Sequence, residues 1–312
     1  MSEAAQRMGG ERASVASLWR RSSRIDARYL IAFLITLVLV LAQLRFHMVG
    51  GYERLVIALG VCVATEALLS WFDRGHVVNL LSAYISGISL TLLTKPQGGA
   101  LWPFVVGAVL AISSKYVLRY RGQHLWNPTN FAISALLLLA PDRVSVLSHQ
   151  FGNDFLTNVV IWSFGLIIAA RVGVLHITLT YVLSFLALSS LRALVLGEPI
   201  APEIAPLTGP MYQLFIFFMI TDPRTVVRGK RKQIAVAIVI AVMEMLIRFG
   251  ADRSWPLPTG FNAAPAFYAL AIVGPVAKWL DLRRRPVKQP VASPAAEPGS
   301  SAAAALVSRT PS

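Results

Sequence analysis

Charged side chains inside long apolar stretches are the first residues of this sequence that could do chemistry. Glu66 and Glu244 each lie within an apolar segment, and Lys115 lies near the end of another. An unpaired charge in an apolar environment costs roughly several kcal/mol, so each carboxylate should be neutral, paired or facing a polar cavity. Two interpretations follow. One is a path for ions or protons along these three residues. The favoured one is structural pairing, with Lys115 or an arginine as the partner.

A second candidate is the carboxylate of Asp222, which stands where the apolar run at residues 217–220 stops. It follows Thr221 and precedes Pro223. A carboxylate at the end of an interrupted helix could accept a hydrogen bond from a ligand or help to coordinate a cation. It could equally cap the helix end, with the nearby Arg224 and Arg228 as partners.

Three asparagines stand at the starts of two other apolar segments. Asn127 and Asn130 belong to the string N-P-T-N, and Asn262 belongs to F-N-A-A-P. Each amide can both donate and accept hydrogen bonds. These side chains could bind the polar edge of a ligand, or they could satisfy carbonyls that the neighbouring prolines leave free. The sequence leaves both possibilities open.

Composition indicates a protein embedded in lipid. The chain is 55% hydrophobic and only 14% charged, whereas soluble domains are about 45–50% apolar and about 25% charged. The formal net charge of +14 comes from cations between apolar runs, which is typical of membrane topology and does not indicate a nucleic-acid partner. The lone Cys62 excludes an internal disulfide or a Cys-ligated iron–sulfur cluster, and the five histidines lack metal-site spacing.

The elements that would position these residues are membrane helices. The fold class expected is all-α, with a polytopic membrane domain at 28–282 between a basic cytoplasmic tail at 1–27 and a disordered cytoplasmic tail at 283–312. The first apolar run begins near Tyr29 and is interpreted as a membrane helix, not a cleavable signal. About ten segments are predicted, at 29–48, 52–72, 77–94, 101–118, 127–141, 155–170, 174–196, 207–222, 232–250 and 262–281.

Charge fixes the predicted orientation. When the segments alternate across the bilayer, most of the 29 Lys and Arg residues fall on the side of the N-terminus. The loop at 197–210, on the other side, has two Glu and no basic residue. By the positive-inside rule, both termini are expected in the cytoplasm of a multi-pass protein of the cell (inner) membrane.

An internal repeat is visible in the two weakest segments. The third is rich in polar residues and the eighth has a short apolar run, and they end alike, in L-L-T-K-P and M-I-T-D-P. Each is followed by a long helix, a connection with Trp, and an Asn-bearing helix that is expected to end on a proline, Pro141 or Pro275. Five segments per half make the repeats, at about 28–147 and 148–282, inverted. Broken helices 3 and 8 would then meet around a polar pocket.

Four strings resemble the NqrB/RnfD family, the flavin-carrying membrane subunits of the sodium-translocating NADH:quinone reductase and of the Rnf complex. They lie at 66–96, 114–139, 217–233 and 245–250, in the order that the family has. The most specific are F-F-M-I-T-D-P-R-T at 217–225 and Asn127-Pro128. The resemblance implies a ten-helix, two-repeat fold, electron transfer, and a flavin held between the repeats. It points to Asn127, Asn130, Thr221, Asp222, Thr225 and Asn262 as the cofactor-binding residues.

One departure from the family bears on the cofactor. Members that attach FMN covalently do so at the Thr of S-G-A-T, in the loop that corresponds to residues 142–154, and this loop has no such string. We therefore expect no covalent FMN and a non-covalent flavin, riboflavin or FMN. More distant relatives of the UnbU type, from enediyne biosynthesis clusters, are small and lack partner-complex signatures, and the chain resembles a divergent member of that type without S-G-A-T.

The leading function hypothesis is a membrane electron-transfer subunit that works with redox partner subunits, with or without coupled ion translocation. Electron relay needs a cofactor but no acid–base machinery, in line with the absence of a catalytic constellation in the sequence. Two alternatives stay open. One is a small-solute or ion conduit of the same fold, and the other is a membrane scaffold in an enediyne-type biosynthetic assembly.

Overall fold

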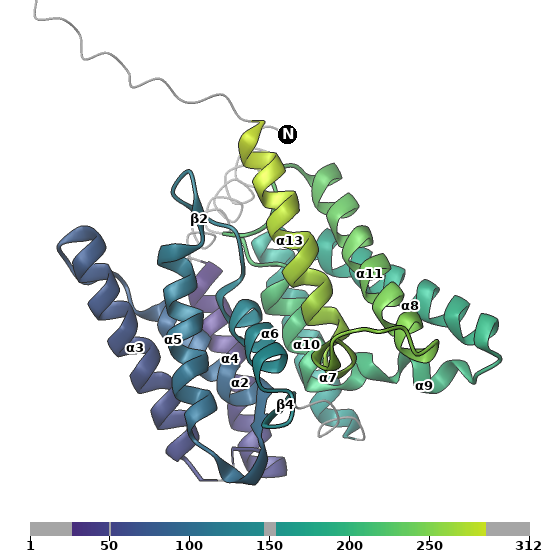
Figure 1. The fold of residues 1–312 in the computed structure, drawn as a ribbon, viewed down its shortest axis with the longest axis horizontal. Coiled ribbons are helices and arrows are strands. Elements are labelled where there is room, and N and C mark those ends of the chain that lie inside the picture. Colours follow the sequence, from purple (N-terminus) through teal and green to yellow (C-terminus); the bar gives the residue numbers. More distant parts are fainter. Residues whose placement is uncertain (1–26, 50, 147–153, 285–312) are drawn as a thin grey trace, which may run out of the picture.

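A computed structural model describes residues 27–49, 51–146 and 154–284 (Figure 1). The predicted tails at 1–27 and 283–312 fall outside these residues except at their inner ends. The described part is mostly helical with very little strand, as expected of an all-α membrane protein. Within it, five helices are long and apolar enough to cross a bilayer. They are α2 (Ala27–Phe46), α3 (Glu53–Arg74), α7 (Phe155–Val172), α8 (Leu175–Leu196) and α11 (Lys230–Asp252).

Other helices occupy the remaining predicted segments. The longer ones are α4 (Leu81–Leu93), α5 (Trp102–Val117), α6 (Pro128–Leu139) and α13 (Pro265–Arg283). The eighth predicted segment is built from α10 (Pro210–Leu214) and the π-helical turn η3 (Phe215–Met219). Three pieces lie in connections that the sequence analysis left without helix: α9 (Ile200–Ile204), η1 (Gln97–Gly99) and much of η2 (Ala205–Thr208). The short α12 (Thr259–Ala263) precedes α13.

Each long helix buries one narrow stripe of residues. Much of its remaining surface is apolar and exposed. In α8 the stripe is Ile177, Tyr181, Phe185, Ser189 and Ala193, one residue in every four. That spacing lines up along one face of a helix. The opposite face carries exposed leucines, as a lipid-facing surface requires. Through such stripes α3 packs on α5, and α8 packs on α11.

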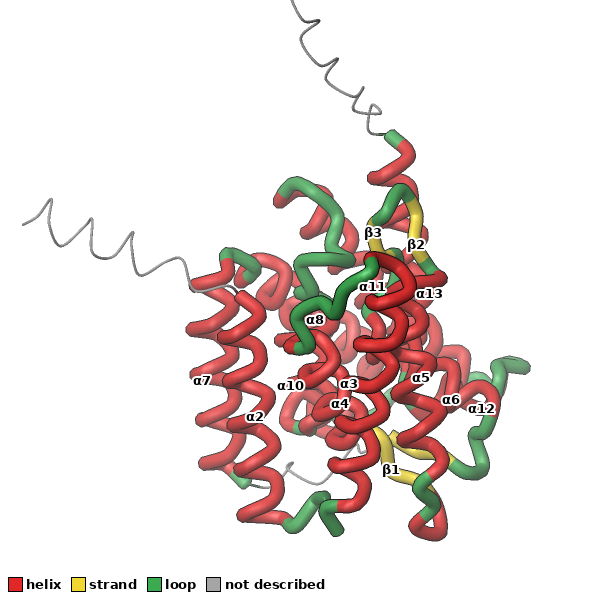
Figure 2. The backbone as a smooth tube through the Cα atoms, turned by 90° about the vertical axis from the view of Figure 1, so that its left-hand side faces the viewer, coloured by secondary structure: helices red, strands yellow, loops and turns green. Residues whose placement is uncertain are grey.

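The two halves of the chain gather on different sides of the molecule. In Figure 1, α3, α4 and α5 lie on the left, and α8, α9 and α11 lie on the right. Figure 2 shows α2 and α7 side by side, and their residues are in contact. The end of α2 and the start of α7 are joined by an ion pair between Arg45 and Asp154 at 3.6 Å.

Both of the segments that the sequence marked as weak are short in the structure, and α4 contacts α10. Helix α4 stops at Leu93, where the chain becomes the strand β1 (Thr94–Pro96). This strand pairs antiparallel with β4 (Val144–Val146), a contact that no local pattern predicted. The eighth segment ends after η3, at the turn that contains Pro223. A second small pair, β2 (Arg119–Tyr120) and β3 (Gln123–His124), forms a hairpin.

The prediction that the last helix ends at Pro275 is wrong. Pro275 lies inside α13, which continues to Arg283. A proline in a helix lacks the N–H that would bond the carbonyl four residues earlier, which here is that of Ala271. The Nε1 of Trp126 donates to this carbonyl at 2.9 Å, so the group freed by the proline is satisfied from another element.

Candidate functional site

A cavity of about 240 Å³ lies where α4, the start of α6 and the end of η3 meet. Helix α4 contributes Ser82, Ser86 and Ser89, which share one face because they are four and three residues apart. The apolar part of the wall includes Phe218 and Met219. The cavity therefore combines hydroxyl groups with an apolar surface, a combination typical of sites for amphipathic ligands.

A direct hydrogen bond joins the two sequence elements that border this cavity. The Nδ2 of Asn127 donates to Oδ2 of Asp222 at 3.1 Å. The side chain of each residue also accepts a hydrogen bond from a nearby backbone amide. Oδ1 of Asn127 accepts from the Asn130 amide at 3.0 Å and caps α6, and Oδ1 of Asp222 accepts from the Arg224 amide at 3.0 Å. We call this pair the Asn127–Asp222 clasp. Asn127 is thus the N-cap of α6, whereas Asp222 bonds a backbone amide of the turn after η3 and does not cap a helix, and both residues line the cavity.

The other threonines predicted for the site lie at different depths. Thr225 lines the cavity, and its hydroxyl contacts the Asp222 carbonyl at 3.4 Å. Thr221 is buried, and its hydroxyl donates to the Phe217 carbonyl at 2.8 Å, so it does not face the cavity. This bond ties Thr221 to the π-helical turn η3.

The remaining asparagines do not join the clasp. Asn130 is buried, and its Nδ2 donates to the Phe267 carbonyl of α13 at 3.1 Å. Its Oδ1 has no hydrogen-bond partner among the described residues. Asn262 is exposed on α12 and does not line the cavity. The structure thus gathers Asn127, Asp222 and Thr225 at one place and leaves Asn262 outside it.

Of the predicted ion-path residues, Lys115 borders the cavity and pairs with Glu66. Their Nζ and Oε2 atoms are 2.7 Å apart, and the side chains are 2% and 6% exposed. The Tyr116 hydroxyl donates to the other oxygen of Glu66 at 2.9 Å. The structural pairing that the sequence favoured is therefore present.

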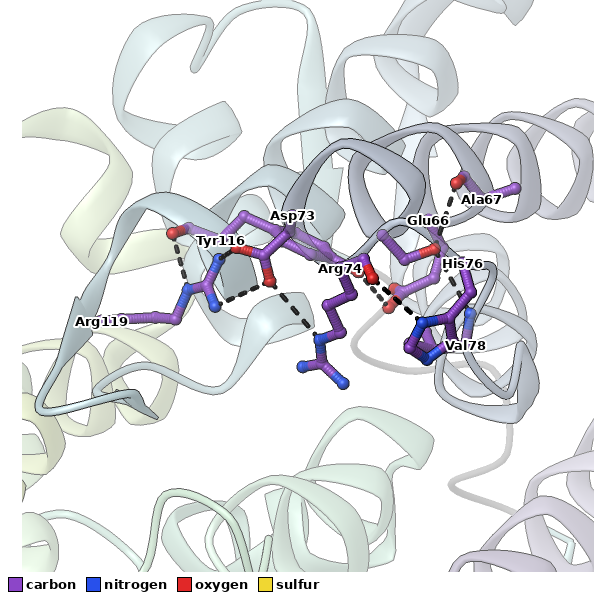
Figure 3. Close-up of polar contacts among 9 residues, drawn as sticks. Glu66, Ala67, Asp73, Arg74, His76, Val78, Tyr116 and Arg119 are labelled. Atoms are coloured by element: carbon purple, nitrogen blue, oxygen red, sulfur yellow. Dashed lines mark hydrogen bonds and ion pairs between the residues drawn. The ribbon is translucent and has the colours of Figure 1, made fainter. Parts of the chain in front are cut away.

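A second cavity, of about 220 Å³, adjoins the first beyond Lys115. The two share five lining residues: Arg28, Ser82, Lys115, His124 and Arg224. At its rim the guanidinium of Arg119 binds the Asp73 carboxylate through two contacts, at 2.9 and 3.1 Å (Figure 3). Arg74 approaches the same carboxylate at 3.5 Å.

His124, on β3, belongs to the wall that both cavities share. Burial, and next the positive charge of Arg224, lower the pKa of this imidazole below its usual 6.5. The ring is therefore neutral at neutral pH. Its Nδ1 atom is buried and has no hydrogen-bond partner within the described part of the chain.

Glu244 lines neither cavity. It is fully buried on α11, where the hydroxyls of Tyr181 and Tyr212 donate to it and Arg248 pairs with it at 3.0 Å. The Tyr212 hydroxyl also contacts Arg248. Structural pairing is present here too, and the two tyrosines are partners that the sequence analysis missed.

No family model matches the chain, and no curated protein matches it significantly. Among the residues that the structure describes, no three His, Cys, Asp or Glu side chains come together as a metal site would require.

Sequence analysis missed several residues that line the cavities. In the sequence, Arg28 is one of the topology charges, His124 is one of the histidines without metal-site spacing, and Arg224 is considered only as a partner of Asp222. Ser82, Ser86 and Ser89 were noted only as polar residues in a weak segment. Their common helical face was a usable signal, since polar residues on one face of a membrane helix point into protein or water.

Proposed function

We propose that this chain is a membrane electron-transfer subunit of the NqrB/RnfD kind that binds a flavin without a covalent bond. One observation carries the proposal. The T-D-P-R-T and N-P strings, which resemble the family's most specific elements, border one cavity and are joined by the Asn127–Asp222 clasp.

The lining chemistry suits a flavin ring. The pyrimidine edge of the ring alternates donors and acceptors, and amide, carboxylate and hydroxyl groups lie at the cavity wall. Phe218 and Met219 offer an apolar surface for the rest of the ring. When bound, the flavin would supply the capacity to take up and pass on electrons. The protein's own part is to hold the polar edge with Asn127 and Asp222 and to keep water from the ring.

The proposed architecture has ten spans in two inverted repeats, at 28–147 and 148–282, with α4 and α10–η3 as the broken helices. The similar packing of the two halves supports it. Each half pairs the helix of its second predicted segment with that of its fourth, α3 with α5 and α8 with α11. Each pair encloses one buried glutamate, Glu66 or Glu244. The basic residues then place both termini in the cytoplasm of a cell (inner) membrane protein.

Partner subunits would supply and accept the electrons, because a chain with one cysteine cannot itself hold an iron–sulfur cluster. A conduit for a small solute or ion is the second candidate, and the charged lining of the second cavity favours it. It predicts a folded, colourless protein.

Purification of the full chain in mild detergent tests the proposal. The sample should show flavin absorption that dithionite bleaches. A denaturing gel under ultraviolet light should show no fluorescent band, because the flavin is not covalently bound. A colourless but monodisperse preparation would overturn the proposal and favour the conduit.

Variants of the clasp make the test specific. Asp222→Ala should release the pigment, while Asp142→Ala, at an exposed position away from both cavities, should retain it. Asn127→Ser keeps a good N-cap for α6 but loses the amide donor, so it should fold and yet lose the pigment. Full retention by both clasp variants would remove these residues from the site.

A further inference from the structure

The second cavity is lined mainly by cations. Arg28, Arg74, Lys115, Arg119 and Arg224 border it, and Glu66 is its one acidic lining residue among those described. We call this cavity the cation chamber. Such a lining does not suit the uncharged ring of a flavin, because positive charges held close together repel one another unless an anion lies between them.

Pairing inside the protein accounts for only part of this charge. Glu66 neutralises Lys115, and Asp73 at the rim binds Arg119 and lies near Arg74. The Arg224 side chain makes no ion pair with any described residue, although it borders both cavities. A surplus of positive charge therefore remains at the wall between the two cavities.

Two buried polar groups at this wall strengthen the case for a ligand. Lys115 is 2% exposed and borders both spaces, so its ammonium is already desolvated and held in place by Glu66. The buried Nδ1 of His124 has no partner among the described residues. A buried polar atom without a partner is costly in a folded protein unless a ligand or water satisfies it.

We infer that the cation chamber binds the phosphate of a phosphate monoester, so that the flavin of the proposed function is FMN and not riboflavin. The inference rests on that function and names the chemistry of its ligand. Arg and Lys side chains are the usual protein groups for binding phosphate oxygens. Because the cavities share five lining residues, one ligand with an uncharged ring and an anionic end can occupy both.

The lack of S-G-A-T fits this arrangement. A phosphate esterified to a threonine is a diester with one negative charge, whereas a free monoester carries about −1.5 to −2 at neutral pH. A non-covalent FMN therefore needs more positive charge around its phosphate than a covalent one. The chamber provides that charge, chiefly through Arg224.

Comparison of two flavins tests the inference. Flavin released by denaturing the purified protein is identified by mass spectrometry, and FMN or riboflavin is then titrated into pigment-depleted protein with fluorescence quenching as the readout. FMN should bind at least about tenfold more tightly. Arg224→Gln should weaken FMN binding by about tenfold and leave riboflavin binding unchanged, because a charge-assisted hydrogen bond is lost only with FMN. Arg231→Gln, at an exposed position that lines neither cavity, is the matched control and should change neither affinity.

Each alternative has its own result. Equal binding of both flavins would overturn the phosphate assignment and leave the proposed function standing. Binding of neither flavin by folded protein would overturn both. A lipid phosphate is the other source of the same chemistry. If Arg224→Gln loses a co-purified anionic lipid but keeps its FMN affinity, the chamber serves the lipid and the assignment to FMN is wrong.

Discussion

The Nζ atom of Lys115 lies 2.7 Å from Oε2 of Glu66, between two helices whose contact buries both side chains almost completely. The pair lies between the first cavity and the cation chamber, since Lys115 borders both and Glu66 borders only the second. The ion pair therefore lies at the boundary between the two cavities.

Removal of one partner of this pair should destabilise the protein strongly. Lys115→Met leaves the Glu66 carboxylate buried without its cation, which typically costs about 3–5 kcal/mol. The double change Glu66→Gln with Lys115→Met should recover most of that loss, because no uncompensated charge remains. Melting temperatures in detergent report both effects. Arg45→Gln, in a largely exposed pair, is the control and should have little effect. A double variant as unstable as the single one would contradict this account.

The two tyrosines bound to Glu244 should contribute differently to the stability of the protein. The Tyr212 hydroxyl contacts both Glu244 and Arg248, whereas the Tyr181 hydroxyl contacts only the carboxylate. Hydrogen bonds to charged groups contribute about 1.5–3 kcal/mol each. Tyr212→Phe should therefore lower the melting temperature more than Tyr181→Phe. The reverse order would show that the tyrosine bridge is not what holds Arg248 in place.

His124 should give the protein a defined pH dependence. Its lowered pKa means that the folded protein binds fewer protons at this site than the unfolded chain does below about pH 6.5. The free energy of unfolding should thus fall as the pH drops through about 6.5 and level off below the lowered pKa. His124→Gln should remove this contribution, seen as a shallower fall in melting temperature between neutral pH and about pH 5. If the melting temperature of the variant fell with pH as steeply as that of the wild type, groups other than His124 would cause the pH dependence.

The proposed orientation can be tested with single cysteines. Cys62 is fully buried and can be changed to Ala to give a cysteine-free background. Gln97, beside β1, and Arg231, near the start of α11, are exposed and should lie on opposite sides of the membrane. A membrane-impermeant maleimide added to intact cells should label Gln97→Cys and leave Arg231→Cys unlabelled until the membrane is opened. Equal labelling of the two in intact cells would refute the topology.

Local features of the chain were read correctly from sequence. The positions of the helices followed from apolar runs, because the hydropathy of roughly 20 consecutive residues decides whether a segment enters lipid. The start of α6 followed from Asn127-Pro128, since the cap and the first-turn proline act within a few residues. The short third and eighth segments were visible for the same reason. The end of α13 was not predicted correctly. The carbonyl that Pro275 leaves free is satisfied by Trp126, which is far away in the sequence, so the helix can continue past the proline.

By itself, then, the sequence determined that this is a helical membrane protein, where its helices lie, and which polar residues interrupt them. Only the tertiary structure decided that Asn127 meets Asp222, that Glu66 meets Lys115, and that Asn262 stays outside the site. The physical reason is that hydropathy, capping and proline geometry act along a few turns of chain. Which two interrupted helices face each other depends instead on how the side chains of distant helices pack, and no local pattern encodes that.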